Sequence, residues 1–442
     1  MAAGLAVPRA WKRSRRRVAS RPRQPAPPVP STDASTAPYV AAETAPLRQV
    51  VVHTPGEEMA LVAPGNAEDL LFDDILALDV ARQEHATLVR VFQSVAGPDA
   101  VLQLGALAAE TFEAQDAREA YVETLVRLMP ERNMEAYAGE LRALPADELL
   151  RFAFTGQAPF PVTAHPLPNL IFTRDLAAVV CDHVVLGSAA TTARRPEGAL
   201  VRTVFGHHPR FAGLADKRIE LSGDVTFEGG DLLVVSDEIV MIGQSERTSL
   251  GGVLRVAEAL VANTPVQHVL MVNLPEERYC MHLDTVFTFA DASTCVVFPP
   301  IITEARHQVV HLEAGDEPGR FQMRILPSVQ VALEELTGRE MTFIPCGGDD
   351  PIMQRREQWT DGANLFALRP GLVVGYERNH RTYDALREHG FHTVDADHFL
   401  GFYGDAPASG DQKIAIRLTG HELSRGRGGP RCLTMPLVRS EA

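Results

Sequence analysis

The strongest constraint on the fold is a pair of short apolar stretches that occurs four times along the chain, each time directly after a polar residue. In the first copy Asp175 precedes Val179-Val180, a turn at Cys181-Asp182-His183 and a second apolar run that ends at Leu186. Apolar runs of this length, joined by turn residues, predict hairpins of two buried strands. The four copies cover residues 175–186, 231–242, 284–300 and 364–376.

Between these hairpins lies a helical stretch followed by one more strand. Residues 253–261 and 329–336 have helical spacing, and the strand-like runs VQHVLMV (266–272) and MTFIPC (341–346) follow them. The predicted unit is therefore strand, strand, helix, strand, and the predicted fold class is α/β. Units that recur in this way are typical of a radial or solenoid array, in which each unit packs on its neighbours. In such an array, the polar residues that begin the first strand of each hairpin would meet at one end of a central axis.

Two segments differ from this pattern. Residues 79–155 have the apolar spacing of helices, and three proline-containing breaks divide them. We expect an inserted helical subdomain there, within a catalytic domain that covers 39–442. Residues 1–38 hold eight Lys and Arg and seven prolines. Because this composition buries too little apolar surface to fold, it predicts a disordered basic tail.

Charge and cysteine content exclude several classes of protein. The 442 residues include 42 Lys and Arg against 57 Asp and Glu, a formal net charge of −15. This surplus of carboxylates disfavours binding to nucleic acid or to an anionic membrane, and no apolar run reaches the roughly 18 residues of a membrane-spanning helix. Five scattered cysteines are too few for a disulfide framework. We expect a soluble cytoplasmic protein without nucleic-acid or membrane partners, and its oligomeric state stays open, a homo-oligomer included.

The polar residues at equivalent places of the repeat form one set of candidates. A cysteine in a glycine-rich loop, a histidine two residues before an aspartate and several further acids predict a thiolate nucleophile that acts on a cationic substrate. Carboxylates suit a guanidinium in particular, because the two planar groups pair through two hydrogen bonds. The candidates lie ahead of a hairpin or in the final stretch RGRGGPRC, and they are Asn169, Arg174, Asp175, Glu228, Asp231, His282, Asp284, Asn364, Arg427 and Cys432.

Each candidate also has a purely structural interpretation. Asp175 could cap a turn, as most aspartates in loops do, and His282 could be a satisfied core histidine. Cys432 could be a small buried apolar side chain, and Glu228 could belong to a tight turn with the two glycines after it. The functional interpretation gains from recurrence, because unrelated structural accidents would not favour the same end of every hairpin.

These motifs resemble those of arginine deiminase, a family of guanidino-group-modifying enzymes with a five-bladed α/β-propeller fold. The resemblance implies such a propeller, built from ββαβ units with a helical insertion, and the hydrolysis of L-arginine to L-citrulline and ammonia. It extends from about residue 47 to 437 and rests on PLPNLIFTRD (166–175), FEGGD (227–231), IGQSERTS (242–249), MHLDTVFT (281–288), REQWTDGAN (356–364) and RGRGGPRCLTMP (425–436).

The resemblance also implies a role for each candidate. Cys432 is the implied nucleophile, and His282 is its general acid and base. Asp175 and Asp284 hold the guanidinium, and Glu228 orients His282. No metal or organic cofactor is required. Five further residues would bind the α-carboxylate and amino end of the substrate or shape the entrance and surroundings of the site. They are Asn169, Arg194, Asp231, Arg247 and Arg427.

The implied chemistry needs these groups because a guanidinium carbon is a poor electrophile, with its charge spread over three nitrogens and a pKa above about 12. Two carboxylates would hold that carbon against the sulfur, which makes the attack a positioned step. A cysteine thiol has an ordinary pKa of about 8.5, so a neighbouring cation must favour the thiolate. We expect free Cys432 to be mostly a thiol that the arriving guanidinium activates. His282 would then protonate the departing ammonia and activate the water that hydrolyses the amidino-cysteine intermediate.

Four other functions stay open at this point. An amidinotransferase would pass the amidino group to an amine, and a dimethylarginine hydrolase would take a methylated substrate. A non-catalytic arginine-binding regulator is a third alternative, although it would not need the nucleophile Cys432. A thiol protease is a fourth, although carboxylates around its cysteine would disfavour the thiolate that it needs. The segment VVLGSAATTARRPEG (184–198) departs from the Asn-x-Met and Arg-Glu-Thr patterns of the deiminases. We therefore expect the contacts to the substrate's carboxylate to differ.

Overall fold

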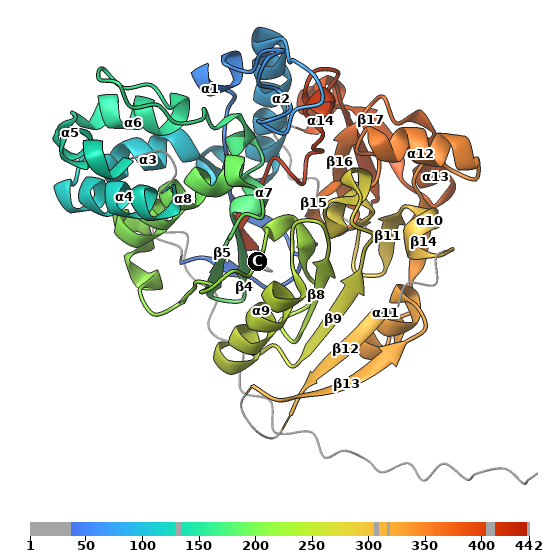
Figure 1. Ribbon diagram of the computed structural model, residues 1–442. Coiled ribbons are helices and arrows are strands. Elements are labelled where there is room, and N and C mark those ends of the chain that lie inside the picture. Colours follow the sequence, from blue (N-terminus) through green and yellow to red (C-terminus); the bar gives the residue numbers. More distant parts are fainter. Residues whose placement is uncertain (1–36, 130–133, 305–308, 316–318, 404–411, 440–442) are drawn as a thin grey trace, which may run out of the picture. The chain divides into compact units, whose positions relative to one another are not determined.

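The computed structural model describes residues 37–129, 134–304, 309–315, 319–403 and 412–439. In this part of the chain, five small sheets are packed among helices, and the fold is mixed α/β (Figure 1). The predicted basic tail lies outside the described residues, apart from its last two positions. In the same described ranges, no helix combines the length and the apolar character needed to span a bilayer.

Four of the sheets contain the same motif, an antiparallel pair with a third strand parallel to its second strand. A helix lies between the second and third strands, namely α8 (Arg195–His207), α9 (Leu250–Asn263), α11 (Val329–Thr337) or α13 (His380–Glu388). The order strand, strand, helix, strand that the sequence predicts is therefore present in each. The strands are β4 (Ala177–Val180), β5 (His183–Leu186) and β6 (Arg218–Ile219); β7 (Leu232–Val234), β8 (Ile239–Gln244) and β9 (His268–Asn273); β10 (Phe287–Phe289), β11 (Thr294–Val297) and β14 (Thr342–Pro345); and β15 (Phe366–Arg369), β16 (Leu372–Tyr376) and β18 (Ile414–Leu418).

The fifth sheet joins the two ends of the described chain. Strand β19 (Met435–Arg439) pairs antiparallel with β2 (Leu47–Val52), and β3 (Val101–Gln103) runs parallel to β2 after helix α2 (Leu78–Ala96). Strand β1 (Tyr39–Val40) adds a parallel strand beside β19. The motif is the same, but its strands come from opposite ends of the sequence. Because a repeat along the chain cannot reveal such a pairing, the sequence predicted only four hairpins.

In three of the four motifs the polar residue lies on a short helical turn ahead of the first strand, whereas Asn364 lies in the loop just ahead of β15. Asp175 lies in α7 (Thr173–Leu176), and Asp231 and Asp284 each lie in a three-residue 3₁₀ turn. The sequence had placed these residues at the start of the strand itself. The helical turn shifts the strand forward, so that β10 begins at Phe287 rather than at Thr285.

The segment between β2 and the first hairpin is mostly helical. Helix α2 and strand β3 belong to the fifth sheet's motif, whereas α3, α4 and α6 gather with α8 on one side of the molecule (Figure 1). The apolar positions Leu88, Val91 and Phe92 of α2 and Tyr121 and Leu125 of α4 are buried, as an amphipathic helix requires, while Val95 and Leu128, which continue the same apolar spacing, are half-buried. The helices outside the motif are α1 (Glu57–Ala60), α3 (Leu104–Phe112), α4 (Gln115–Leu128), α5 (Ala138–Ala143) and α6 (Ala146–Thr155).

The remaining elements extend two sheets and cover their faces. Strands β12 (Val309–Ala314) and β13 (Phe321–Leu326) continue the sheet of β9, and β17 (His392–Asp395) pairs with β18. The start of α12 is readable in the sequence, because Asp350 caps it and Pro351 occupies its first turn. The other helices are α10 (Pro299–Ile302), α12 (Pro351–Trp359) and α14 (Ala396–Tyr403), of which α14 packs on α2.

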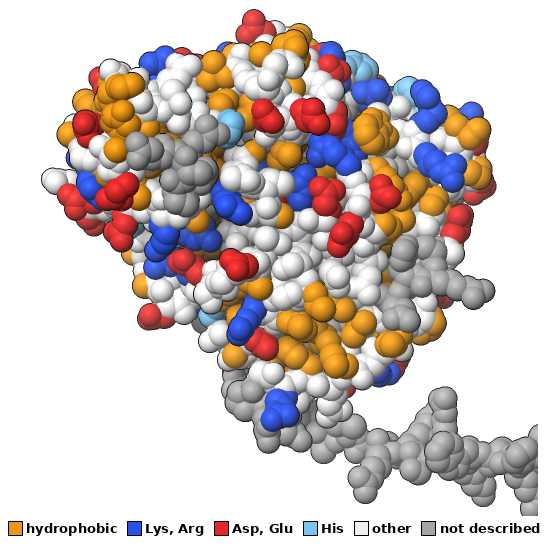
Figure 2. Space-filling view, viewed as in Figure 1, with side chains coloured by type: hydrophobic (Ala, Val, Ile, Leu, Met, Phe, Trp, Pro, Cys, Tyr) orange, Lys and Arg blue, Asp and Glu red, His pale blue; other side chains and the backbone are white. Residues whose placement is uncertain are grey.

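Exposed charges of both signs are interspersed on the face of the molecule that Figure 2 shows. Two exposed ion pairs in the described part of the chain are Lys217–Asp182, at 2.7 Å, and Arg425–Asp74, at 2.8 Å. Such exposed pairs contribute little to stability. By contrast, the charged candidates Asp175, Glu228 and Asp284 are buried.

Candidate active site

One cavity brings most of the predicted site residues together. It is partly open to solvent and has about 30 Å³ of free space for the centre of a water-sized guest, and we call it the thiol pocket. Asp284, Glu228 and Asp231 do not line it. Asp284 contacts Cys432 and Glu228 contacts His282, both at its wall, and Asp231 accepts from the backbone amide of Leu283, the residue after His282. The predicted residues that line it are Asn169, Asp175, Arg194, Arg247, His282, Arg427 and Cys432.

Two glycines allow three segments to meet at the wall of the thiol pocket. A Cβ atom on Gly229 would lie 2.3 Å from the carbonyl oxygen of Arg174. A Cβ atom on Gly230 would lie 2.8 Å from both Asp175 Oδ1 and His282 Cγ. Since real Cβ contacts are longer than this, only glycine permits so close an approach. The glycines of the FEGGD stretch therefore have a packing role that brings Asp175 and His282 together.

His282 is held between two carboxylates. Its Nε2 lies 2.8 Å from Glu228 Oε2, and its Nδ1 lies 3.7 Å from Asp175 Oδ1. Burial by itself lowers the pKa of His282, but the carboxylates of Asp175, Glu228 and Asp231 outweigh it and raise the pKa to about 10. Burial conversely raises the pKa of Glu228, and the bond to His282 together with Arg194 lowers it to about 2. At neutral pH the pair is an imidazolium and a carboxylate.

Arg194 lies on the same carboxylates. Its Nη1 donates to Asp175 Oδ2 at 2.6 Å and to Glu228 Oε2 at 3.4 Å, and its Nε donates to Glu197 at 3.0 Å. A further bond runs from its Nη2 to the carbonyl oxygen of Asn169. The structure thus puts Arg194 at the acidic end of the pocket. A contact with the α-carboxylate of a substrate, which the sequence predicted, would need Arg194 to leave this position.

Cys432 lies beside a third buried carboxylate. Its Sγ is 3.7 and 3.9 Å from the two oxygens of Asp284. Burial raises the pKa of the Cys432 thiol well above its ordinary value, and the carboxylates of Asp284, Asp175 and Asp361 raise it further. This direction favours the thiol over the thiolate in the free site, which is the state that the sequence-based hypothesis proposes.

Asn364 fixes the backbone around this thiol. Its Oδ1 accepts a hydrogen bond from the Cys432 amide at 3.1 Å, and its Nδ2 donates to the Asp284 carbonyl at 3.0 Å. The carbonyl of Cys432 accepts from the Arg174 amide at 3.1 Å. Asn364, a candidate by its phase in the repeat, therefore links the segments of Cys432 and Asp284.

Asn169 and Asp231 are engaged in the walls of the pocket. Asn169 donates from Nδ2 to the carbonyl of Leu70 at 2.9 Å. Asp231 accepts from Ser245 Oγ at 2.7 Å and from the Leu283 amide at 2.8 Å, and its burial raises its pKa to about 7. Both residues connect loops that carry other site residues.

Several buried polar atoms at the pocket have no hydrogen-bond partner among the described residues. One of them is the carboxylate oxygen Oδ1 of Asp175. The others are guanidinium nitrogens, namely Nε of Arg247 and both Nε and Nη1 of Arg427. Arg427 is fixed over the ring of Trp359, 3.4 Å from its centroid. Because buried polar atoms are normally satisfied, the pocket fits a ligand that brings donors to one carboxylate and acceptors to two guanidinium groups.

Asp175, Glu228 and His282 also match a metal site in residue type and spacing, because their ligand atoms lie within 4.8 Å of one another. However, Arg194 already forms ion pairs with both carboxylates. The raised pKa of His282 also favours a proton on the imidazole, and a metal needs the neutral ring. The set therefore fits a protonated histidine and a guanidinium better than a metal ion.

Three buried charged residues near the site were missed from the sequence. Arg431 donates from Nη1 to Asp284 at 2.7 Å and from Nε to Glu43 at 2.8 Å. Glu197 pairs with Arg194 three residues earlier. The i, i+3 spacing within ARRPEG could have indicated Glu197, and the adjacency to Cys432 could have indicated Arg431. No local pattern distinguishes Glu43.

Comparison with known proteins gives a consistent result. The model of the family described as arginine deiminase matches residues 68–140 and 131–439. The arginine deiminase of Listeria monocytogenes serotype 4b is 34% identical over 425 residues, which cover 90% of this chain and 97% of that protein. That of Listeria welshimeri is 35% identical over 428 residues, with 90% and 98% covered. The structure of unliganded AgrE has a TM-score of 0.50 at 15% identity, covering 89% of this chain and 40% of that one, and so resembles it in fold alone.

Proposed function

This chain belongs to the arginine deiminase family, and we propose that the thiol pocket is the place where it hydrolyses L-arginine to L-citrulline and ammonia. The activity is that of a hydrolase that acts on a carbon–nitrogen bond of a linear amidine. One observation carries the assignment to this pocket. Asp175, Arg247 and Arg427 line the same cavity, and each has a buried polar atom without a hydrogen-bond partner among the described residues, although Asp175 Oδ1 lies 3.7 Å from His282 and Arg247 Nε lies 3.5 Å from Glu246. This pattern is complementary to a guanidinium at one end of a ligand and a carboxylate at the other.

Binding of the substrate would change the state of the thiol. A guanidinium between Asp175 and Asp284 offsets the carboxylates that now raise the pKa of Cys432. With the guanidinium and the imidazolium of His282 nearby, the thiolate becomes the favoured form. Asp284, whose oxygens lie 3.7 and 3.9 Å from Sγ, is the nearest carboxylate to accept the thiol proton.

The reaction then follows in two halves. The thiolate of Cys432 attacks the guanidinium carbon, the carbon–nitrogen bond breaks, and His282 gives its proton to the departing ammonia. This leaves an amidino group on the sulfur and a neutral imidazole. A water molecule attacks the same carbon while His282 takes its proton, the carbon–sulfur bond breaks, and L-citrulline leaves. Glu228, 2.8 Å from His282, orients the ring throughout.

The remaining site residues have supporting roles in this proposal. Arg247 and Arg427 bind the α-carboxylate, and Asn169 and Asp231 position neighbouring loops. Arg194 holds Asp175 and Glu228 in the free enzyme, and the incoming guanidinium competes with it for Asp175. The departure of the 184–198 segment from the family pattern agrees with an unusual arrangement at Arg194.

We also propose that the five sheets are the five blades of a propeller, with the last blade assembled from both ends of the chain. The shared strand motif supports this, as does the way each blade contributes a residue from the turn ahead of its first strand. Within the predicted insertion 79–155, α3 to α6 would be the inserted helical subdomain, while α2 and β3 complete a blade.

The activity is tested with purified protein and L-arginine alone. We expect L-citrulline and ammonia in equal amounts with no acceptor amine present. Ornithine formation that depends on an added amine would instead indicate an amidinotransferase, and turnover of methylated arginine in preference to arginine would indicate a dimethylarginine hydrolase. Binding of arginine without any product would indicate a regulator.

The thiol step has its own test. The ultraviolet absorbance of the thiolate is titrated against pH with and without an inert guanidinium analogue. We expect the analogue to move the transition to lower pH, and two superimposed titration curves would reject activation by substrate.

A further inference from the structure

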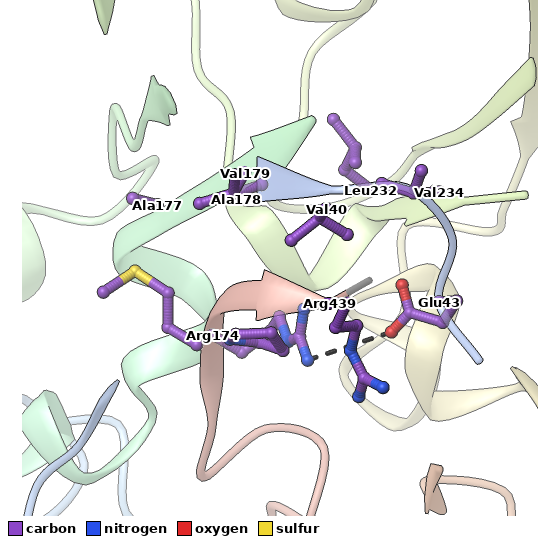
Figure 3. A pocket seen from close by; sticks show the side chains of 11 residues that line it. Val40, Glu43, Arg174, Ala177, Ala178, Val179, Leu232, Val234 and Arg439 are labelled. Atoms are coloured by element: carbon purple, nitrogen blue, oxygen red, sulfur yellow. Dashed lines mark ion pairs between the residues drawn. The ribbon is translucent and has the colours of Figure 1, made fainter. Parts of the chain in front are cut away.

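A second buried cavity adjoins the segments that form the thiol pocket, and it carries charges that the reaction does not use. Its free space for the centre of a water-sized guest is about 10 Å³, which is room for one small guest. Figure 3 shows the side chains of Arg174 and Arg439 extending toward Glu43, with apolar side chains such as Val40 and Leu232 around them. Arg174 and Arg431 precede Asp175 and Cys432 in the sequence. We call Arg174, Arg431, Arg439 and Glu43 the arginine cluster.

The arginine cluster has more cations than carboxylates. Oε1 of Glu43 accepts from Arg431 Nε at 2.8 Å and lies 3.8 Å from Arg174 Nη2. Arg431 also pairs with Asp284 at 2.7 Å. Burial raises the pKa of Glu43, but the surrounding arginines lower it to about 2, so the carboxylate is ionised. Among the described residues of this region, three guanidinium groups, those of Arg174, Arg431 and Arg439, stand against the two carboxylates of Glu43 and Asp284, which leaves one positive charge in excess.

The excess charge falls on Arg439. Its side chain is 1% exposed. Nη1 and Nη2 donate to the carbonyls of Ala45, at 2.8 Å, and Ala367, at 2.7 Å, and the guanidinium lies over Phe366, 4.6 Å from the ring centroid. Within the described ranges it forms no ion pair, and its Nε has no hydrogen-bond partner. Arg174 Nη2 likewise has no hydrogen-bond partner there.

We propose that this cavity binds one small monovalent anion of the halide type, such as chloride, between Arg174 Nη2 and Arg439 Nε. An uncompensated buried cation is costly, and one negative charge removes the excess without creating a new one. A water molecule could accept the two hydrogen bonds but would leave the charge. By holding Arg174 beside Glu43, the anion would also steady the segment that carries Asp175.

Thermal unfolding of the full chain tests the proposal without reference to activity. Chloride is exchanged stepwise for methanesulfonate at constant ionic strength. We expect a saturable rise in Tm of roughly 2–4 °C with chloride. The rise should vanish in Arg439→Gln and persist in the matched control Arg381→Gln, whose side chain is 62% exposed. A Tm of the unaltered protein that does not respond to chloride would overturn the proposal.

A second measurement uses only the unaltered protein, so that a failure of Arg439→Gln to fold leaves the test intact. Crystals of the full chain are soaked in bromide, and the anomalous difference density is calculated. We expect a peak within hydrogen-bond distance of both Arg174 and Arg439. An ordered water without anomalous signal at that point would overturn the proposal.

Discussion

The thiol pocket and the arginine cluster are built from neighbouring residues of the same two segments, yet they have opposite chemistry. Asp175 and Cys432 line the first, whereas Arg174 contacts Glu43 and Arg431 links Glu43 to Asp284. In the thiol pocket, carboxylates raise the pKa of the thiol and of His282, which prepares the site for a cation. In the arginine cluster, guanidinium groups lower the pKa of Glu43. The difference teaches that adjacent residues of one segment can face groups of opposite sign, so that each region favours a different ligand.

Removing the nucleophile gives the largest expected effect on the thiol pocket. For Cys432→Ala we expect kcat to fall by at least about 10⁴-fold, since the covalent step is lost. The fold should persist, because the change removes one sulfur and no ion pair. Citrulline formation measures the activity and thermal unfolding measures the fold. Retained turnover in this variant would rule out the mechanism.

Neutralising one carboxylate of the thiol pocket comes next. For Asp175→Asn we expect kcat/KM to fall by about 10²–10⁴-fold, because the grip on the guanidinium weakens and the plane of the substrate is no longer fixed. Steady-state kinetics with L-arginine measures it. Asp182→Asn, an aspartate in a partly exposed pair with Lys217, is the control and should keep its activity.

Changing Arg431 tests whether the two regions are coupled. Arg431→Gln leaves Asp284 and Glu43 without their buried partner, so we expect the free energy of unfolding to fall by roughly 3–5 kcal/mol. We also expect kcat to fall by about 10–100-fold at little change in KM, since Asp284 loses its orientation. Denaturant unfolding and steady-state kinetics measure the two effects.

The control for Arg431 is Arg425→Gln, which breaks an exposed pair with Asp74 and should cost less than about 1 kcal/mol. An Arg431→Gln protein with normal kcat would show that Arg431 supports the fold without positioning Asp284.

The smallest expected effect is a shift in pH dependence. Glu228→Gln removes a carboxylate that raises the pKa of His282 from 6.5 to about 10. Because the reaction needs the imidazolium as an acid, we expect the alkaline limb of kcat/KM to move down by about 1–3 pH units. Glu220→Gln, which removes an exposed carboxylate that pairs with the half-buried Arg202, should leave it in place.

The same variant affects stability with a defined sign. Since the folded pKa of His282 is raised, the stability it contributes is fully present below pH 6.5 and is lost as the pH rises toward about 10. Unfolding measurements at several pH values should therefore show the largest difference between the unaltered protein and Glu228→Gln at the acidic end of this window.

The kinetic prediction has its own contrary outcome. If the alkaline limb of kcat/KM is unchanged in Glu228→Gln, a group other than His282 supplies the acid.

Much of the fold was readable from local patterns. The alternation of apolar and turn residues predicted the hairpins that became β4–β5, β7–β8, β10–β11 and β15–β16. The helical stretches 253–261 and 329–336 lie within α9 and α11. The pairing of β19 with β2 was not readable, because it joins residues nearly 400 positions apart that share no local signal.

The candidate site divides in the same way. Asp175, His282 and Cys432 could be named from residue type and from their phase in the repeat. The contact between Arg194 and Asp175, at 2.6 Å, could not be predicted from the sequence, because it depends on where the loop that carries Arg194 folds back. Glu43 shows the limit most clearly, since nothing in its neighbourhood marks it, although it is buried between arginines from distant segments.

The sequence by itself determined the strand and helix units, the family and the residue types available for chemistry, because periodicity and motif spacing are properties of contiguous chain. Only the tertiary structure decided which charges share a cavity and which lie one residue away in another. The reason is physical: the pKa of a buried group and the net charge around it depend on desolvation and on distances between segments remote in sequence. Such distances exist only once the chain has closed on itself.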